Sequence, residues 1–480
     1  MANATLLVLS LILAVGAAAG EGVQFEPYEY TYQGQRIQAE LGRFVVPERH
    51  EKRDGHQISL AFVRLKSTSA QPGPPIVYLA GGPGGSGIEL AKGPRGQAFL
   101  AMCEAGDVIA LDQRGVGLSQ PNLACPGSLD FPLTAPGDRQ AVLARFSEKS
   151  RACASFWRER GVDLSAYNVV ESAHDLDSLR RALGAKTIRL WGSSYGTFLA
   201  LAVIRHHGDV IDRAVLSGVE GPDHTLKLPS TTDRQLKVLA KLVAADPATR
   251  RDIGNFSGLV ARVLGAAQQK PFDIPVGGPQ STSSRSVTLG RFDLEQLIMA
   301  MTGERAGLEQ LPRILLAFDR GDFSSPLVQT VARLAIAQRT GSIGPAMAFA
   351  TDCSSGTSAQ RLARIQRETK VAMLAHFDFP IPEVCPTWGV PELPPSERTP
   401  VRSKIPVLFI SGTVDGRTPP HNAEEVKRGF PNSIHVLIEG SGHGNDLFVA
   451  SPEITKLMVE YMKTGNALAN RIQLPPLRFH

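Results

Sequence analysis

The pentapeptide Gly192–Gly196, Gly-Ser-Ser-Tyr-Gly, is the stretch whose residue types point most directly to chemistry. It follows a short apolar run of strand type, Thr187–Trp191, and precedes an apolar run of helical type, Thr197–His206. A Gly-x-Ser-x-Gly sequence between a strand and a helix is typical of a nucleophile elbow, a tight turn that exposes a serine Oγ. We therefore predict that Ser194 is a catalytic nucleophile. The alternative is a serine in an ordinary glycine-rich turn.

A nucleophilic serine needs a base to take its proton, and the base needs a carboxylate to orient it. Asp415 follows the buried strand-type run Ile405–Ile410, and His443 follows a second such run, Ser433–Ile438. Of the 11 histidines, only His443 both follows such a run and is flanked by glycines. The chain order Ser, Asp, His is that of α/β-hydrolases. We predict that these two residues complete a triad with Ser194.

Two alternatives stay open for this triad. Asp446 is a second carboxylate close to His443, but Asp415 is favoured because it directly closes a strand. Either member could also be structural, Asp415 as a helix cap and His443 as a buried, hydrogen-bonded histidine.

A second glycine-rich loop, Gly81–Gly87, follows the apolar run Pro75–Ala80. Its glycines would let the backbone approach a ligand closely. A phosphate-binding loop is one interpretation, but the Lys-Ser/Thr ending of a P-loop is missing. We favour an oxyanion hole in which Gly82 and Tyr195 donate backbone N–H groups and Gly81 shapes the loop.

The elements that must position these residues alternate between strand and helix. Asp107–Leu111 and Ile211–Leu216 are further buried strand-type runs, and Glu171–Leu183 has helical spacing. This alternation predicts an α/β protein with the α/β-hydrolase fold, a mostly parallel central sheet flanked by helices. In the loop after Leu111, we expect Asp112 and Arg114 to hold the turn by hydrogen bonds rather than to react.

The middle of the chain is rich in segments with helical spacing. It predicts a helical cap, residues 226–390, inserted before the last strands. It would separate a first core part, residues 21–225, from a last one, residues 391–480. Gln120–Asp163 reads as a loop-rich excursion within the first part, and Gly277–Arg285 as a polar loop within the cap. The segments with helical spacing in the cap are Asp233–Ala244, Phe256–Gln268, Asp293–Thr302, Gly307–Phe318, Leu327–Gln338 and Gln360–Arg367.

The first residues have the composition of a secretory signal peptide, residues 1–20. Leu6–Ala19 is continuously apolar or small and ends in small residues typical of a cleavage site, although no Lys or Arg precedes it. A membrane anchor is the alternative, but the run is short for a full span. We expect an exported protein, periplasmic or extracellular, with no stable membrane span after removal of the signal.

Export permits disulfides, and the chain has five cysteines. Cys125 and Cys153 lie near each other in the sequence, as do Cys353 and Cys385, and we predict these two disulfides. Cys103 would remain a buried thiol. The alternative is five free thiols.

The charge and the distribution of His and Cys limit the classes of partner that we expect for the protein. Its 480 residues carry a net charge of +5, and the charges are scattered without long Lys or Arg runs, so nucleic-acid binding is not indicated. No cluster of His and Cys has metal-binding spacing, and we expect no metal and no cofactor. The sequence leaves the oligomeric state open.

With these residues in place, the chain resembles the prolyl-aminopeptidase family of α/β-hydrolases, peptidase family S33. The resemblance lies in Gly81–Gly87, Asp112–Ser119 and Gly192–Gly196, and Cys385–Trp388 is similar to the C-terminal region of the secreted tripeptidyl aminopeptidase branch. The family loop usually begins His-Gly-Gly-Pro-Gly, whereas this chain has Ala80 in place of the His.

The resemblance implies a serine peptidase that releases single residues or tripeptides from peptide N-termini. In this family, acidic residues of the cap hold the substrate amino group, and Glu220, Asp223 and Glu304 are the candidates here. The first alternative is an esterase or amidase that acts on small acyl substrates with the same triad. The second is a binding protein on an inactive hydrolase scaffold.

Overall fold

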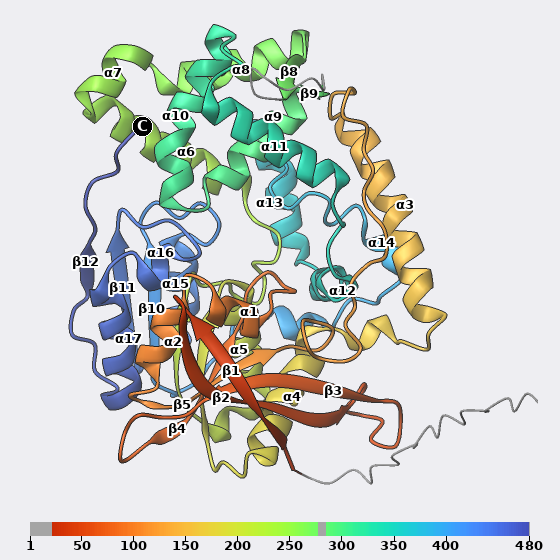
Figure 1. Cartoon of the computed structure of the whole chain (residues 1–480), viewed down its shortest axis with the longest axis vertical. Coiled ribbons are helices and arrows are strands. Elements are labelled where there is room, and N and C mark those ends of the chain that lie inside the picture. The colour runs from red at the N-terminus through yellow and green to blue at the C-terminus, as the bar shows by residue number, and fades with distance from the viewer. Residues whose placement is uncertain (1–21, 277–284, 480) are drawn as a thin grey trace, which may run out of the picture.

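A computed structural model describes residues 22–276 and 285–479. The predicted signal peptide, residues 1–20, lies outside the described residues. The chain forms a lower layer built on one large sheet and an upper layer made mainly of helices, the cap (Figure 1).

Ten strands form the large sheet, in the order β1-β2-β3-β5-β4-β6-β7-β10-β11-β12. β1, β2, β3 and β5 pair antiparallel in that order, and every pair from β5 to β12 is parallel. The mostly parallel sheet of the α/β-hydrolase fold is thereby confirmed. The bounds are β1 (Gln24–Tyr32), β2 (Gln35–Pro47), β3 (Gln57–Leu65), β4 (Gly73–Leu79), β5 (Gly106–Asp112), β6 (Ile188–Ser193), β7 (Ile211–Ser217), β10 (Val407–Gly412), β11 (Ser433–Glu439) and β12 (Arg471–Gln473).

Helices cover both faces of this sheet. Successive side chains of a strand point to opposite faces, so each strand contributes to two separate cores. In β4, Ile76 and Tyr78 pack into one core while Val77 and Leu79 pack into the other. The first core includes α1 (Gly87–Lys92), α2 (Gly96–Met102), α16 (Asp446–Val449) and α17 (Pro452–Thr464). The second includes α4 (Val169–Ala182), α5 (Tyr195–His207) and α15 (Pro420–Lys427).

The cap has a hydrophobic core of its own and is not purely helical. Its helices are α6 (Pro229–Ala245), α7 (Pro247–Ile253), α8 (Phe256–Gln269), α9 (Arg291–Met301), α10 (Arg305–Arg320), α11 (Pro326–Thr340), α12 (Ala346–Ser355) and α13 (Ala359–Thr369). The expectation of a helical insertion with a polar loop at Gly277–Arg285 was incomplete, because β8 (Phe272–Val276) and β9 (Arg285–Leu289) form an antiparallel hairpin around residues 277–284, which lie outside the described part. In β8, Phe272, Ile274 and Val276 pack on the cap core and alternate with Asp273 and Pro275, so a strand pattern of period two was present.

The excursion Gln120–Asp163, predicted to be rich in loops, contains the long helix α3 (Arg139–Arg158) along the side of the molecule (Figure 1). Leu143, Phe146 and Ala154 of α3 pack in a small apolar cluster with α12 and α14 (Cys385–Trp388). Short 3-10 turns lie at Leu164–Ala166, Gly208–Val210 and Pro395–Arg398.

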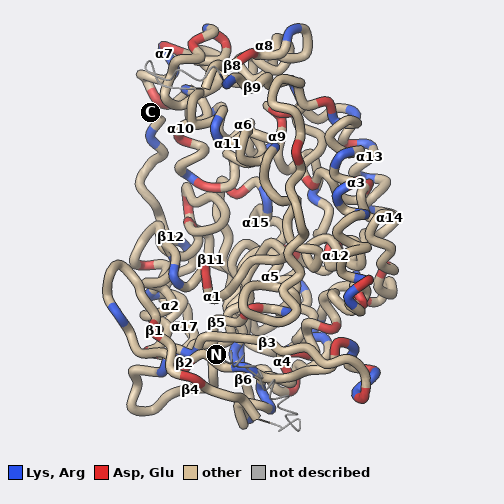
Figure 2. Tube along the Cα trace, turned by 45° about the vertical axis from the view of Figure 1, so that its right-hand side comes forward, with Lys and Arg blue, Asp and Glu red and all other residues tan. Residues whose placement is uncertain are grey.

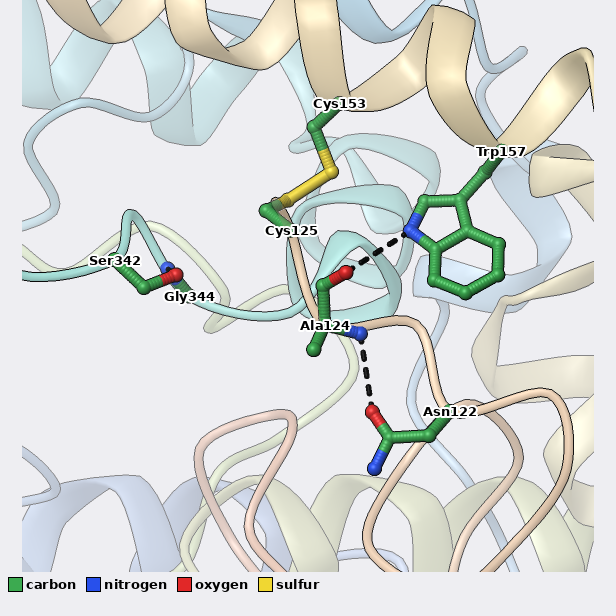
Figure 3. The surroundings of a disulfide bond; sticks show 7 residues. All are labelled: Asn122, Ala124, Cys125, Cys153, Trp157, Ser342 and Gly344. Carbon is green, nitrogen blue, oxygen red and sulfur yellow. Dashed lines mark hydrogen bonds between the residues drawn. A yellow bond between two sulfur atoms is a disulfide. The ribbon is translucent and has the colours of Figure 1, made fainter. Parts of the chain in front are cut away.

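Two disulfides fix this side of the molecule, Cys125–Cys153 and Cys353–Cys385, while the Cys103 thiol is buried and free. Beside the first, the Trp157 indole N–H donates to the carbonyl of Ala124 at 3.2 Å (Figure 3). Both disulfides fit a protein that folds in an oxidising compartment.

Charged residues of both signs are interspersed along the chain in both layers (Figure 2). Among residues 22–276 and 285–479, no helix combines the length and the apolar character needed to cross a membrane.

Arg114 has a fully buried side chain, and its partners lie outside the turn that it was expected to hold. Its guanidinium is 0 % exposed, donates to both carboxylate oxygens of Asp175 at 2.7 and 2.6 Å, and also reaches the carbonyls of Glu48 and Ala166. Arg114→Ala should lower the free energy of unfolding by about 3–5 kcal/mol, because Asp175 would stay buried with only the His50 imidazole, 2.8 Å from its Oδ1, as a partner. Denaturant unfolding measures this loss. Arg36→Ala, which removes an exposed pair with Glu29, is the control and should change stability little.

Candidate active site

Ser194 lies on a strained turn between β6 and α5. Its φ and ψ are 55° and −125°, a region that residues other than glycine rarely adopt. A Cβ on Gly196 would lie 2.0 Å from the Leu79 carbonyl oxygen, and one on Gly192 would lie 2.7 Å from the Gly196 carbonyl oxygen. The two flanking glycines are therefore required for the turn, which has the geometry of a nucleophile elbow.

Asp415 and His443 meet at the ends of β10 and β11. Asp415 Oδ2 lies 2.8 Å from His443 Nδ1, and its Oδ1 accepts the backbone N–H groups of Arg417 and Thr418 at 2.7 and 2.9 Å. Burial alone would raise the pKa of Asp415, but the imidazole of His443 and the hydrogen bonds from Thr418 hold that pKa below its usual value. The carboxylate is thus ionised and fixes the orientation of the imidazole.

The loop after β7 contacts both Ser194 and His443. The Ser194 N–H donates to the Ser217 carbonyl at 3.0 Å, and a Cβ on the next residue, Gly218, would lie 3.0 Å from His443 Cε1. Within the described residues, no hydrogen bond joins Ser194 Oγ to His443 Nε2. Catalytic hydrogen bonds are often long in unliganded enzymes and shorten when substrate binds.

The predicted oxyanion loop lies directly against the elbow. A Cβ on Gly81 would lie 2.9 Å from Ser194 Cβ, so only glycine allows this approach. Gly82 has a φ of 124° and lines the same cavity as Ser194. Tyr195 is the first residue of α5, where helix N–H groups have no partner within the helix. In the described part of the chain, neither the Gly82 nor the Tyr195 N–H has an acceptor, so both are available to a ligand.

The other carboxylates near the site have structural partners. Asp446 Oδ2 accepts the backbone N–H groups of Arg305 and Gly442 at 2.7 and 3.0 Å. Asp112 accepts hydrogen bonds from the Ser86 hydroxyl and the Leu118 N–H, and so closes its own turn. Neither carboxylate orients the imidazole of His443 in this structure.

Ser194 opens into a cavity of about 160 Å³ that is rich in carboxylates. Glu220, Asp352, Asp378 and Lys227 line it together with Ser194. The Lys227 ammonium donates to Glu220 Oε2 at 2.8 Å, and its backbone N–H donates to Asp378 Oδ2 at 2.6 Å. In residues 22–276 and 285–479, the Asp352 carboxylate makes no hydrogen bond and no ion pair.

Burial has the largest effect on the pKa values of Asp378 and Asp352. It raises the pKa of Asp378 to about 6, against the opposing effect of the nearby Lys227. Burial and the neighbouring charges of Glu220 and Asp378 raise the pKa of Asp352 well above its usual value. A cation that enters the cavity would stabilise the ionised form of these carboxylates.

The three acidic residues expected at this site separate in the structure. Only Glu220 lines the Ser194 cavity, and Glu304 lines a neighbouring cavity beside His443. Asp223 instead accepts hydrogen bonds from the N–H and hydroxyl of Ser358 at the start of α13, so its expected place at the site was wrong.

Sequence reasoning missed Asp352 and Asp378. Each stands alone among apolar or small residues, Asp352 near the end of the apolar helix α12 and Asp378 between two phenylalanines. An isolated carboxylate in such a run is a signal that could have pointed to them. No group of three or more His, Cys, Asp or Glu side chains suited to a metal ion occurs among the described residues.

Comparisons with known proteins agree with this architecture. A family model described as "alpha/beta hydrolase fold" matches residues 74–251, and one described as "TAP-like protein" matches residues 377–471. The "Tripeptidyl aminopeptidase" of Streptomyces lividans is 25% identical over 495 residues, which cover 97% of this chain and 88% of that protein.

Two further matches are more limited. "Serine protease Hip1" of Mycobacterium bovis is 28% identical over 238 residues, 46% of this chain and 46% of that protein. The crystal structure of bromoperoxidase from Bacillus anthracis aligns with a TM-score of 0.40 and 16% identity, covering 88% of this chain and 99% of that one.

Proposed function

Because this chain is a hydrolase of the α/β-hydrolase fold with a TAP-like C-terminal region, we propose that it is an exported serine aminopeptidase. It releases single residues or tripeptides from the N-termini of peptides. Its likeness to a tripeptidyl aminopeptidase over nearly its whole length supports the peptide substrate, and its two disulfides support export.

The proposed reaction passes through an acyl-enzyme on Ser194. His443 takes the Ser194 proton as Oγ attacks the scissile carbonyl, and then gives that proton to the leaving amine. Asp415 holds the imidazole and stabilises its positive charge. The Gly82 and Tyr195 N–H groups stabilise the oxyanion, and water then releases the acyl group from Ser194.

The observation that carries the aminopeptidase proposal is the group of carboxylates beside Ser194. Glu220, Asp352 and Asp378 share one small cavity with the nucleophile, and the Lys227 ammonium forms its ion pair with Glu220 alone among these three described residues. A substrate ammonium is the complementary charge, and its binding places the N-terminal end of the peptide next to Ser194. An esterase on neutral acyl groups would have no use for these buried acids.

A substrate panel tests the proposal. Aminoacyl and tripeptidyl arylamides with a free amino group are compared with their N-acetylated forms and with short acyl esters. We expect kcat/KM to favour the free amines, and the ratio between aminoacyl and tripeptidyl substrates gives the length released. If the enzyme hydrolyses only the esters, the peptidase proposal is wrong and the esterase alternative replaces it.

Asp378→Asn and Asp352→Asn should each raise KM for free-amine substrates by roughly 10- to 100-fold, because each removes a charge-assisted contact to the ammonium.

Since the pKa of Asp378 is raised to about 6, this carboxyl is protonated below that pH and ionised above it. KM of the wild-type enzyme should therefore rise as the pH falls through about 6. Steady-state kinetics between pH 5 and 8 measure both effects.

The same pH series contains its own check. In Asp378→Asn, KM should lose the part of its pH dependence that this carboxyl causes. Asp322→Asn, at an exposed position after α10, changes the same formal charge away from the cavity and should leave KM unchanged. An equal rise of KM for N-acetylated substrates would mean that the carboxylates maintain the fold of the cavity rather than bind an amine.

A further inference from the structure

Arg417 carries a guanidinium that the described protein leaves unpaired. Its backbone N–H donates to Asp415 Oδ1 at 2.7 Å, and the residue lines the cavities of both Ser194 and His443. The side chain is half-buried, and its Nε is buried without an acceptor. It makes no ion pair within residues 22–276 and 285–479, and its Cζ lies 5.8 Å from the ring centroid of Phe377.

This guanidinium stands where three cavities meet. Arg417 lines the 160 Å³ cavity of Ser194 and a cavity of about 380 Å³ that contains His443 and Glu304. It also lines an apolar cavity of about 580 Å³ whose walls include residues of α9 and α11. A ligand that extends from Ser194 past His443 therefore has to pass Arg417.

The chemistry of acyl transfer decides which part of the substrate Arg417 meets. His443 must give its proton to the leaving amine, so the leaving fragment begins beside the imidazole. The acidic group of Asp352 and Asp378 belongs to the Ser194 cavity and suits the ammonium of the acyl fragment. Arg417 lines both cavities, but it is the one Lys or Arg among the residues that line the His443 cavity, so it is the cation that the leaving fragment meets there.

We propose that Arg417 binds a carboxylate of the leaving fragment. A guanidinium presents parallel N–H donors that match a carboxylate in a bidentate pair, and in a partly buried cavity an unpaired guanidinium gains most from such a partner. The carboxylate is either the C-terminus of a short peptide or an acidic side chain near the scissile bond. The inference rests on the proposed aminopeptidase function and extends it to a preference for short or acidic peptides.

Three peptides of matched sequence, all with a free amino group, test this inference. One ends in a free carboxylate, one ends in an amide, and one ends in an amide but carries Asp directly after the scissile bond. The wild-type enzyme should cleave at least one carboxylate form with a kcat/KM roughly 10- to 100-fold above that of the plain amide. The form that is favoured identifies the source of the carboxylate.

Variants of Arg417 show whether the guanidinium causes this preference. In Arg417→Gln the ratio between carboxylate and amide substrates should fall close to one, and Arg417→Lys should restore part of it because a point charge replaces the planar fork. Arg333→Gln removes the same formal charge from an exposed position of α11 and should keep the wild-type ratio.

The outcomes separate this inference from the proposed function. Wild-type cleavage of the carboxylate and amide peptides at equal rates would overturn the role of Arg417 but leave the aminopeptidase intact. An unchanged ratio in Arg417→Gln would do the same. Hydrolysis of acyl esters with no turnover of any free-amine peptide or arylamide would overturn both.

Discussion

Ser194→Ala is expected to lower kcat/KM by at least about 10⁴-fold, because the loss of a nucleophilic serine removes the covalent route while binding and the oxyanion hole remain. Substrate KM should change much less than kcat. The variant should also lose labelling by a fluorophosphonate, which reacts only with an activated serine hydroxyl. Both readouts follow from the turn that exposes Ser194 and from its place beside the free N–H groups of Gly82 and Tyr195.

Ser193 provides the matched control, since it is the other serine of the same elbow. It is the last residue of β6, it is buried, and its hydroxyl accepts a hydrogen bond from the buried Arg95 at 3.2 Å. Ser193→Ala should keep fluorophosphonate labelling and most of the turnover. Substantial activity in Ser194→Ala would contradict the proposed acyl-enzyme and revive the binding-protein alternative.

The sequence could predict the strands that end near the site because each is a buried run with a glycine-containing loop after it. β6, β10 and β11 all lie in the parallel part of the sheet, so Ser194, Asp415 and His443 reach the same edge. Steric demands of the backbone add to this signal, since Gly192 and Gly196 have no room for a side chain. Local patterns of this kind can be recognised in one sequence without any other information.

The cap side of the site could not be predicted in the same way. Asp352 is on α12 and Asp378 is in the segment before α14, and the Cys353–Cys385 disulfide together with tertiary packing brings both to the Ser194 cavity. No spacing rule connects two such acids. The helix α3 was missed for a related reason, because its polar face is largely exposed and several of the apolar partners of its other face, such as α12 and α14, lie far along the chain.

Asp415→Asn should lower kcat by about 10⁴-fold without unfolding the protein. Asp415 Oδ1 accepts two backbone N–H groups, so the asparagine oxygen must take that position and its NH₂ must face His443 Nδ1. The asparagine NH₂ then donates to Nδ1, which favours the tautomer with the ring proton on Nε2. The Thr418 hydroxyl lies 3.0 Å from Nδ1 and, having lost its Asp415 acceptor, can turn its proton to Nδ1 as well. An imidazole with this tautomer cannot take the proton of Ser194. The pH dependence of kcat and the melting temperature, measured together, separate this effect from loss of fold.

Asp446→Asn discriminates between the two carboxylates near His443. Asp446 Oδ2 accepts the N–H groups of Arg305 and Gly442, and an asparagine oxygen can accept both of them. Its substitution should therefore cost less than tenfold in kcat and should chiefly affect stability, because no proton on His443 depends on it. A loss of about 10⁴-fold in Asp446→Asn with a mild effect in Asp415→Asn would reverse the assignment of the acid. The depressed pKa of Asp415 supports the present assignment, since that carboxylate stays ionised through the pH range in which the imidazole must accept a proton.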